Sequence, residues 1–278
     1  MEEYNLPQEE VKRFEVYKGK NTEQMPKLIA DGRVPANVSQ LMQRRLDLRN
    51  DKTGVKNFYR GNYFATGDGV VYHPDGRVKI VLDSQHLRDM TSESPRNGGA
   101  LILSEDVYKA LEGEEFKKGK LGKTGESMSK ADVKAHPLWK VLARDQKLLN
   151  DYADYIFTEG KQMFGYDTEM EIFLVSANGE TPEIRAWYFY GLENRSLAYG
   201  LGNIVNDFGR LLGIAPDDSN RNQRVNVYPK NKIERALEEL GFSDLTKTLM
   251  NKIRRGKIKW KNTIYLKKKL IDLSCMRV

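Results

Sequence analysis

The chain has 278 residues, 39% of them hydrophobic and 10% aromatic, which is enough to bury a core and argues against global disorder. Its single cysteine, Cys275, excludes an internal disulfide framework and a cysteine-based zinc site. The net charge of +7 is uneven: residues 247–278 hold eleven Lys or Arg and one acid, so this segment carries +10 and the remainder −3. Such asymmetry favours a polyanionic partner for the basic end.

The first residues and the hydropathy along the chain predict a cytoplasmic protein without membrane contact. Residues 1–15 are acidic and polar and contain no apolar stretch of the kind found in secretory signals. No run approaches the roughly 18 apolar residues that a membrane-spanning helix needs.

Residues 1–112 are predicted to form an N-terminal α+β domain with a β-meander at 57–83. Phe58 and Tyr59 supply the bulk that strands favour. The sequence His-Pro-Asp-Gly at 73–76 predicts a tight turn, because proline presets one φ and glycine accepts the positive φ that follows.

The next two segments are predicted as a linker and a second mixed domain. Residues 113–133 are rich in Gly, Lys, Ser and acids, which indicates a flexible linker or loop. Residues 134–229 are predicted as helix, β-hairpin and helix. Alternating runs at 168–175 and 183–190 predict the hairpin. An apolar stripe of helical period over 197–212 predicts the last helix, which is expected to begin near Asn203 because glycines at 200 and 202 disfavour a helix.

Residues 230–278 predict a basic C-terminal module. Apolar spacing over 233–240, with Gly241 as its stop and Ser243 as the next cap, indicates two short helices joined by a glycine-containing turn. Beyond Gly256 the apolar period becomes two and lysines alternate along the other side. The order of helix, turn, helix and basic hairpin resembles a winged helix-turn-helix in outline. The fold class is therefore α+β, with two α/β-mixed halves, antiparallel hairpins and a C-terminal helix-turn-helix plus basic hairpin.

The basic module predicts nucleic-acid binding, with DNA or RNA as the partner. Alternating lysines on a strand lie about 7 Å apart, which is similar to the spacing of phosphates along a nucleic-acid strand. Aromatic side chains between them would stack on unpaired bases. The predicted contacts are Arg254, Arg255, Lys257, Lys259, Trp260, Lys261, Tyr265, Lys267, Lys268 and Lys269.

Two alternative functions remain open at this stage, and whether the protein is an enzyme is left undecided. The first is a metal-dependent nucleic-acid hydrolase, because carboxylates at a sheet edge beside a cation suit Mg²⁺. Its candidate catalytic residues are Asp167, Glu169, Glu171, Glu183 and Arg185, for which simple cross-strand ion pairs are the competing explanation. The second is a scaffold that binds another protein. No cofactor and no metal site are predicted, because the three histidines lie far apart and the glycines at 119–124 lack phosphate-loop spacing.

Overall fold

A computed structural model describes residues 13–216, apart from 53, 118, 166–169 and 192–195. The chain divides into two units after Pro216, and the described residues belong to the first. The predicted basic module at 230–278 therefore lies outside the described residues.

Helices and short strands alternate along the described chain. The helices are α1 (Asn21–Ala30), α2 (Val38–Asp47), α3 (Gly54–Gly61), α4 (Gln85–Arg88), α5 (Glu105–Ala110), α6 (Lys130–Ala135), α7 (Pro137–Ala143) and α8 (Gln146–Phe164). The strands are β1 (Phe14–Lys18), β2 (Val34–Pro35), β3 (Phe64–Tyr72), β4 (Val78–Val81), β5 (Arg96–Asn97), β6 (Ala100–Ile102), β7 (Glu114–Phe116), β8 (Ser127–Met128), β9 (Met170–Phe173), β10 (Glu183–Phe189), β11 (Ser196–Tyr199) and β12 (Arg210–Ile214). None of these helices combines the length and apolar character that crossing a bilayer requires.

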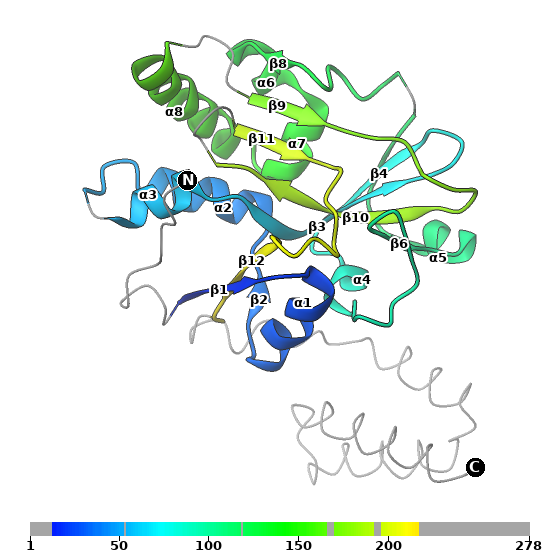
Figure 1. Cartoon of the computed structure of the whole chain (residues 1–278). Coiled ribbons are helices and arrows are strands. Elements are labelled where there is room, and N and C mark those ends of the chain that lie inside the picture. The colour runs from blue at the N-terminus through cyan, green and yellow to red at the C-terminus, as the bar shows by residue number, and fades with distance from the viewer. Residues whose placement is uncertain (1–12, 53, 118, 166–169, 192–195, 217–278) are drawn as a thin grey trace, which may run out of the picture. The chain divides into compact units, whose positions relative to one another are not determined.

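The described strands form one mixed sheet (Figure 1). Its main order is β1-β12-β3-β10-β11-β9-β8, and β4 extends it beside β3. The pairs β11–β9 and β12–β3 are parallel, whereas the remaining pairs are antiparallel. Helices and a mixed sheet together make an α+β fold, as predicted.

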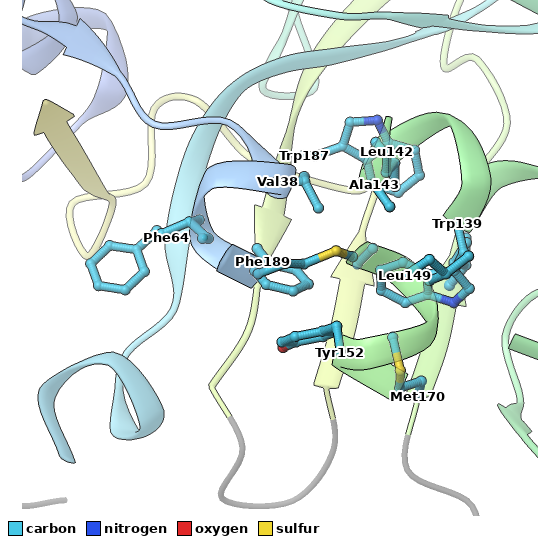
Figure 2. Packing of buried hydrophobic residues seen from close by; sticks show 14 of the residues in the cluster. Val38, Phe64, Trp139, Leu142, Ala143, Leu149, Tyr152, Met170, Trp187 and Phe189 are labelled. Atoms are coloured by element: carbon cyan, nitrogen blue, oxygen red, sulfur yellow. The ribbon is translucent and has the colours of Figure 1, made fainter. Parts of the chain in front are cut away.

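One face of the sheet is covered by α2, α3, α6, α7 and α8. Trp187 and Phe189 of β10 are buried there against Trp139 of α7 and Tyr152 of α8 (Figure 2). The Trp139 and Phe189 rings meet edge-on, with centroids 6.3 Å apart. Burying each of these aromatic side chains supplies about 3 kcal/mol, so this face contains the main core.

The opposite face is covered by α1, α4 and α5. Buried side chains from the three helices meet alternate residues of the central strands there. The helical contributors are Met25, Leu28, Leu87 and Tyr108. These helices pack against β12, β3, β10 and β4, at one side of the sheet. Strands β9 and β11 lie further along, beside α6, α7 and α8 of the other face (Figure 1).

An ion cluster around the buried carboxylate of Asp68 fixes the break between α7 and α8. Arg144 adopts a left-handed φ of 64° and donates at 2.6 Å to both Asp68 and Asp83. Asp68 is fully buried and also accepts the backbone N–H of Val38 at 2.9 Å. Burial raises the pKa of Asp68, against the lowering effect of Arg144. The junction between the two helices is thereby joined to β3 and to the start of α2.

The predicted β-meander at 57–83 is half right. Strands β3 and β4 form a hairpin, and the turn at 73–76 is confirmed by a bond from the N–H of His73 to the carbonyl of Arg77 at 3.0 Å. Phe58 and Tyr59, however, lie in α3 and not in a strand. Both rings are buried against the core, and this packing outweighs their preference for strands.

The hairpin predicted from 168–175 and 183–190 is wrong, because β11 lies between β9 and β10. The helix predicted from the apolar stripe at 197–212, with its start near Asn203, is also wrong, since this stretch forms β11, a loop and β12. Within the loop, a Cβ on Gly202 would lie 2.2 Å from the carbonyl oxygen of Ala186. The backbone at Gly202 lies too close to β10 for a helix to fit there. The helical spacing of the apolar residues in this stretch is therefore incidental.

Residues 113–133 lie inside the first unit and in part belong to the sheet. Within this range β7 pairs with β4, and β8 pairs with β9. Their loop-like composition reflects short strands at the margin of the sheet, where few side chains need to be apolar.

Candidate functional site

Four half-buried aromatic rings follow one another across the sheet, and we call them the aromatic strip. Phe173 ends β9, Tyr199 ends β11, Tyr190 follows β10, and Tyr63 precedes β3. Tyr199 lies opposite Phe173 in the parallel register, and the N–H of Tyr190 bonds to β11. The strip therefore crosses four neighbouring strands.

The alternation of side chains along the strands places the strip on the face opposite α8. Each member follows or precedes a residue whose side chain is buried in the main core, on the other face. These core neighbours are Ile172, Ala198, Phe189 and Phe64. Tyr63, Tyr190 and Tyr199 pack in part against the second cluster, yet remain partly open to solvent.

The rings of the strip contact one another in sequence. Phe173 and Tyr199 are stacked with centroids 5.0 Å apart, and Tyr199 meets Tyr190 edge-on at 5.6 Å. Tyr190 and Tyr63 are stacked at 5.2 Å. At the end of the strip the guanidinium of Arg210 lies 5.6 Å from the Tyr63 ring centroid. Aromatic contacts of this kind each add about 1 kcal/mol and hold the rings in place.

The three tyrosines of the strip add hydroxyl groups to its ring area. Burial raises the pKa of Tyr190, with a smaller contribution from the neighbouring Tyr199 and Tyr63. Tyr63 donates its hydroxyl to the carbonyl of Phe208 at 2.7 Å. The strip therefore combines apolar ring area with groups that donate and accept hydrogen bonds.

The strip rests on a rigid base. On the other face of the sheet, the buried guanidinium of Arg45 lies 4.4 Å from the ring centroid of Phe189, directly before Tyr190. Arg45 donates to the carbonyl of Tyr59 at 3.1 Å and to the hydroxyl of Tyr152 at 2.9 Å. A contact surface on a supported sheet keeps its geometry better than one on a loop.

A second aromatic cluster lies on the same face of the sheet, and charged side chains cover its tyrosine ring. The buried ring of Tyr108 has the Lys79 ammonium 4.3 Å and the Arg77 guanidinium 5.1 Å from its centroid. Tyr108 donates its hydroxyl to Glu115 at 2.6 Å, and the His73 ring lies 4.7 Å away. Each of these charged groups has a partner within the cluster, so it is a structural unit.

The described members of the predicted hydrolase site do not share an open cleft. Glu183 and Arg185 are both buried and face each other at 3.3 Å, and Arg185 also donates to the carbonyl of Gly98 at 2.8 Å. Glu171 lies on β9, two strands and about 10 Å from β10. Asp167 and Glu169 lie outside the described residues. Within the described ranges, no group of three or more His, Cys, Asp or Glu is arranged to hold a metal ion.

All ten predicted nucleic-acid contacts, from Arg254 to Lys269, lie outside the described residues. The sequence reasoning missed the aromatic strip, because it gave Tyr63, Phe173 and Tyr190 only a place in predicted strands and placed Tyr199 in no strand. A signal was available, because residues 187–190 form a run of four aromatic residues, Trp-Tyr-Phe-Tyr. In a strand, alternate rings of such a run face away from the core.

Comparison with known proteins gives a likeness of fold. No protein-family model and no curated protein matches the chain. A solved structure described as "Accommodation of massive sequence variation in Nanoarchaeota by the C-type lectin fold" is similar, with a TM-score of 0.53 and 12% identity. The match covers 73% of this chain and 97% of that one. At this identity the likeness shows a fold of the C-type lectin kind and carries no information on what the chain binds.

Proposed function

We propose that the described unit is a protein-binding module and that the aromatic strip is its contact surface. The observation that carries the proposal is the continuous row of four half-exposed rings on a rigid sheet. Tyrosine offers large, amphipathic contact area at a low cost in conformational entropy, and aromatic residues with arginine are enriched at protein interfaces.

The ring geometry favours a protein over a ligand that stacks. A nucleic-acid base needs an open ring face for stacking. In the two stacked pairs of the strip, each ring already has one face against its neighbour. The partly exposed rings and the phenol hydroxyls suit the mixed apolar and polar surface of a folded protein.

The structural likeness is compatible with this proposal. In the similar structure the C-type lectin fold accommodates massive sequence variation. Carried over to this chain, that property supports a scaffold whose surface side chains determine what is bound while the core maintains the backbone.

The test compares three forms of the full chain as bait in extract of the source cells. The strip variant is Tyr190→Ser combined with Tyr199→Ser. The control is Lys147→Ala, which changes an exposed side chain on α8, behind the other face of the sheet. We expect a protein that is retained by wild type and control and lost with the strip variant.

The retained protein is then purified and titrated against each form. Loss of two central rings should weaken its binding by at least about 30-fold, as for other aromatic hot spots. Equal affinity for wild type and the strip variant would contradict the proposal. A glycan-array signal that disappears with the strip variant would replace the protein partner by a carbohydrate.

We also propose, from charge alone, that residues 247–278 bind DNA or RNA. Their net charge of +10 is the observation that favours this second function. Binding of labelled single- and double-stranded nucleic acid is measured over a salt series, for wild type and a full-length Lys257→Gln, Lys259→Gln, Lys261→Gln variant. If the three lysines contact phosphates, the slope of log K against log salt for duplex DNA should fall by about 2.7. Unchanged slopes on every nucleic acid would contradict this assignment.

A further inference from the structure

The chain contains two Asn-Gly dipeptides, Asn97-Gly98 and Asn178-Gly179, and the fold brings them together. A Cβ on Gly98 would collide with the side-chain amide of Asn178, and a Cβ on Gly179 would lie 2.9 Å from Nδ2 of Asn97. Each asparagine side chain therefore lies on the glycine of the other dipeptide. All four residues are exposed, so water reaches both dipeptides.

An Asn-Gly dipeptide carries both groups of a deamidation reaction that needs only water. The backbone nitrogen of the glycine attacks Cγ of the asparagine and forms a C–N bond, and the side-chain nitrogen leaves as ammonia with the proton of the glycine N–H. Water then opens the resulting succinimide ring at either carbonyl carbon, which gives aspartate or isoaspartate. Glycine favours the attack, because it has no Cβ in the way and its backbone adopts conformations closed to other residues.

The fold holds the backbone of Asn97-Gly98 in place. Asn97 pairs with Ala100 in the hairpin of β5 and β6. Gly98 has a positive φ of 51°, and its carbonyl accepts a hydrogen bond from Nη2 of Arg185 at 2.8 Å. Closing the succinimide ring requires the backbone to rotate on both sides of the Asn97–Gly98 peptide bond, which would break these contacts. Asn97 therefore reacts only when the hairpin opens.

Asn178-Gly179 lies in the loop that joins β9 to β10, where the backbone is not held in this way. No hydrogen bond joins residues 176–181 to any residue that the structure describes. The backbone of this stretch can therefore rotate into the ring-closing geometry without losing a hydrogen bond. The two identical dipeptides thus differ in the free energy that ring closure requires.

We propose that Asn178 is a site of spontaneous deamidation in the folded protein, and that the hairpin protects Asn97 from the same reaction. The new carboxylate forms close to a cation, because the Cβ on Gly98 that would collide with Asn178 would also lie 3.6 Å from Nη2 of Arg185. Opposite charges at this separation attract each other, so the aspartate stays where the amide was. The modified fraction grows with the age of the protein, whatever the aromatic strip binds.

The first experiment incubates the full chain at mildly alkaline pH, once folded and once unfolded in guanidinium chloride. Peptic peptides, prepared at acidic pH where deamidation is slow, are analysed by mass spectrometry. Isoaspartate is counted by methyl transfer from labelled S-adenosylmethionine with a protein isoaspartate methyltransferase. In the folded chain, we expect position 178 to react at least about tenfold faster than position 97, because Asn97 waits for the hairpin to open. In the unfolded chain the two rates should be similar.

The second experiment compares Gly179→Ala with the matched variant Asn97→Gln. Gly179→Ala keeps the asparagine but places a methyl group beside the attacking nitrogen, so it should slow the reaction at position 178 severalfold. Asn97→Gln changes the neighbouring side chain and should leave the rate at position 178 unchanged. Gly179→Ala should also slow the reaction in guanidinium chloride, which separates an effect on ring closure from an effect on folding.

Three outcomes would overturn the proposal. The first is equal rates at positions 97 and 178 in the folded chain. The second is a folded chain that leaves Asn178 intact over a time in which the unfolded chain is modified there. The third is a rate at position 178 that Gly179→Ala leaves unchanged, since the amide would then be lost by direct hydrolysis and not through the ring.

Discussion

Two regions of the same sheet face are built around tyrosine, and they differ in what covers the rings. At β4 and α5, charged groups surround Tyr108: Lys79 and Arg77 lie against its ring, and Glu115 accepts its hydroxyl hydrogen. At β9, β11 and β10, the rings of the aromatic strip contact one another and remain partly exposed. In the first arrangement the Tyr108 ring is buried, whereas the second leaves ring area partly exposed to solvent.

The difference shows how the same residue type serves stability in one place and recognition in another. Burial and the hydrogen bond to Glu115 raise the pKa of Tyr108, which therefore stays neutral and satisfied inside the cluster. Tyr190 is only half-buried, so its removal takes less surface out of the folded core. Stability measurements can test this contrast without any knowledge of the partner.

The largest expected effect is that of Tyr108→Ala. The change removes a buried ring and leaves Lys79 without its aromatic neighbour, so we expect a loss of about 3–5 kcal/mol in the free energy of unfolding. Tyr190→Ala should cost about 2 kcal/mol, because its ring is half-exposed and loses two aromatic contacts. Urea unfolding followed by tryptophan fluorescence measures both variants. Equal losses at the two positions would remove the distinction between a closed and an open region.

An intermediate effect is expected for Arg45→Met, which tests the base beneath the strip. Methionine fills similar volume but leaves the carbonyl of Tyr59 and the hydroxyl of Tyr152 without their donor. Removing hydrogen bonds to a buried charged group should cost about 2–3 kcal/mol. Arg45→Lys, which keeps the charge but not the planar fork, should fall between wild type and Arg45→Met. If Arg45→Met unfolds at the same urea concentration as wild type, the buried guanidinium does not support the sheet.

Local patterns in the sequence predicted those elements whose signal is itself local. The turn at 73–76 is confirmed, because it depends on a few adjacent residues. The sequence also predicted the α+β class. Phe58 and Tyr59 were assigned to a strand, because their helix is stabilised by distant core residues that the local pattern does not show.

The strip could not be assembled from the sequence, because its members come from three separate regions of the chain. Tyr63 lies more than a hundred positions before Tyr190, and the order of the strands brings them together. Helical spacing over 197–212 also pointed to the wrong element, so Tyr199 was not assigned to a sheet. Only the insertion of β11 between β10 and β9 aligns Tyr199 with Phe173.

The smallest effect is a pH dependence at the closed region. Asp75 accepts bonds from the backbone and side chain of Arg77 and lies 2.7 Å from a ring nitrogen of His73. Burial acts to raise the pKa of this carboxyl, but the hydrogen bonds from Arg77 and His73 prevail and lower it to about 2. An aspartate in an unfolded chain has a pKa of about 3.9. The stabilisation from Asp75 is therefore complete above about pH 4 and is lost as the pH falls towards 2.

Asp75→Asn isolates this contribution, because asparagine keeps the shape and loses the charge. The difference in free energy of unfolding between wild type and Asp75→Asn should be under about 1 kcal/mol at pH 7, since the side chain is half-exposed. That difference should shrink between about pH 4 and pH 2. Glu105, whose pKa is also lowered by His73, is present in both proteins and cancels from the comparison. A difference that stays constant over this pH range would show that Asp75 acts through the shape of the turn and not through its charge, and that the region around Tyr108 is closed by packing alone.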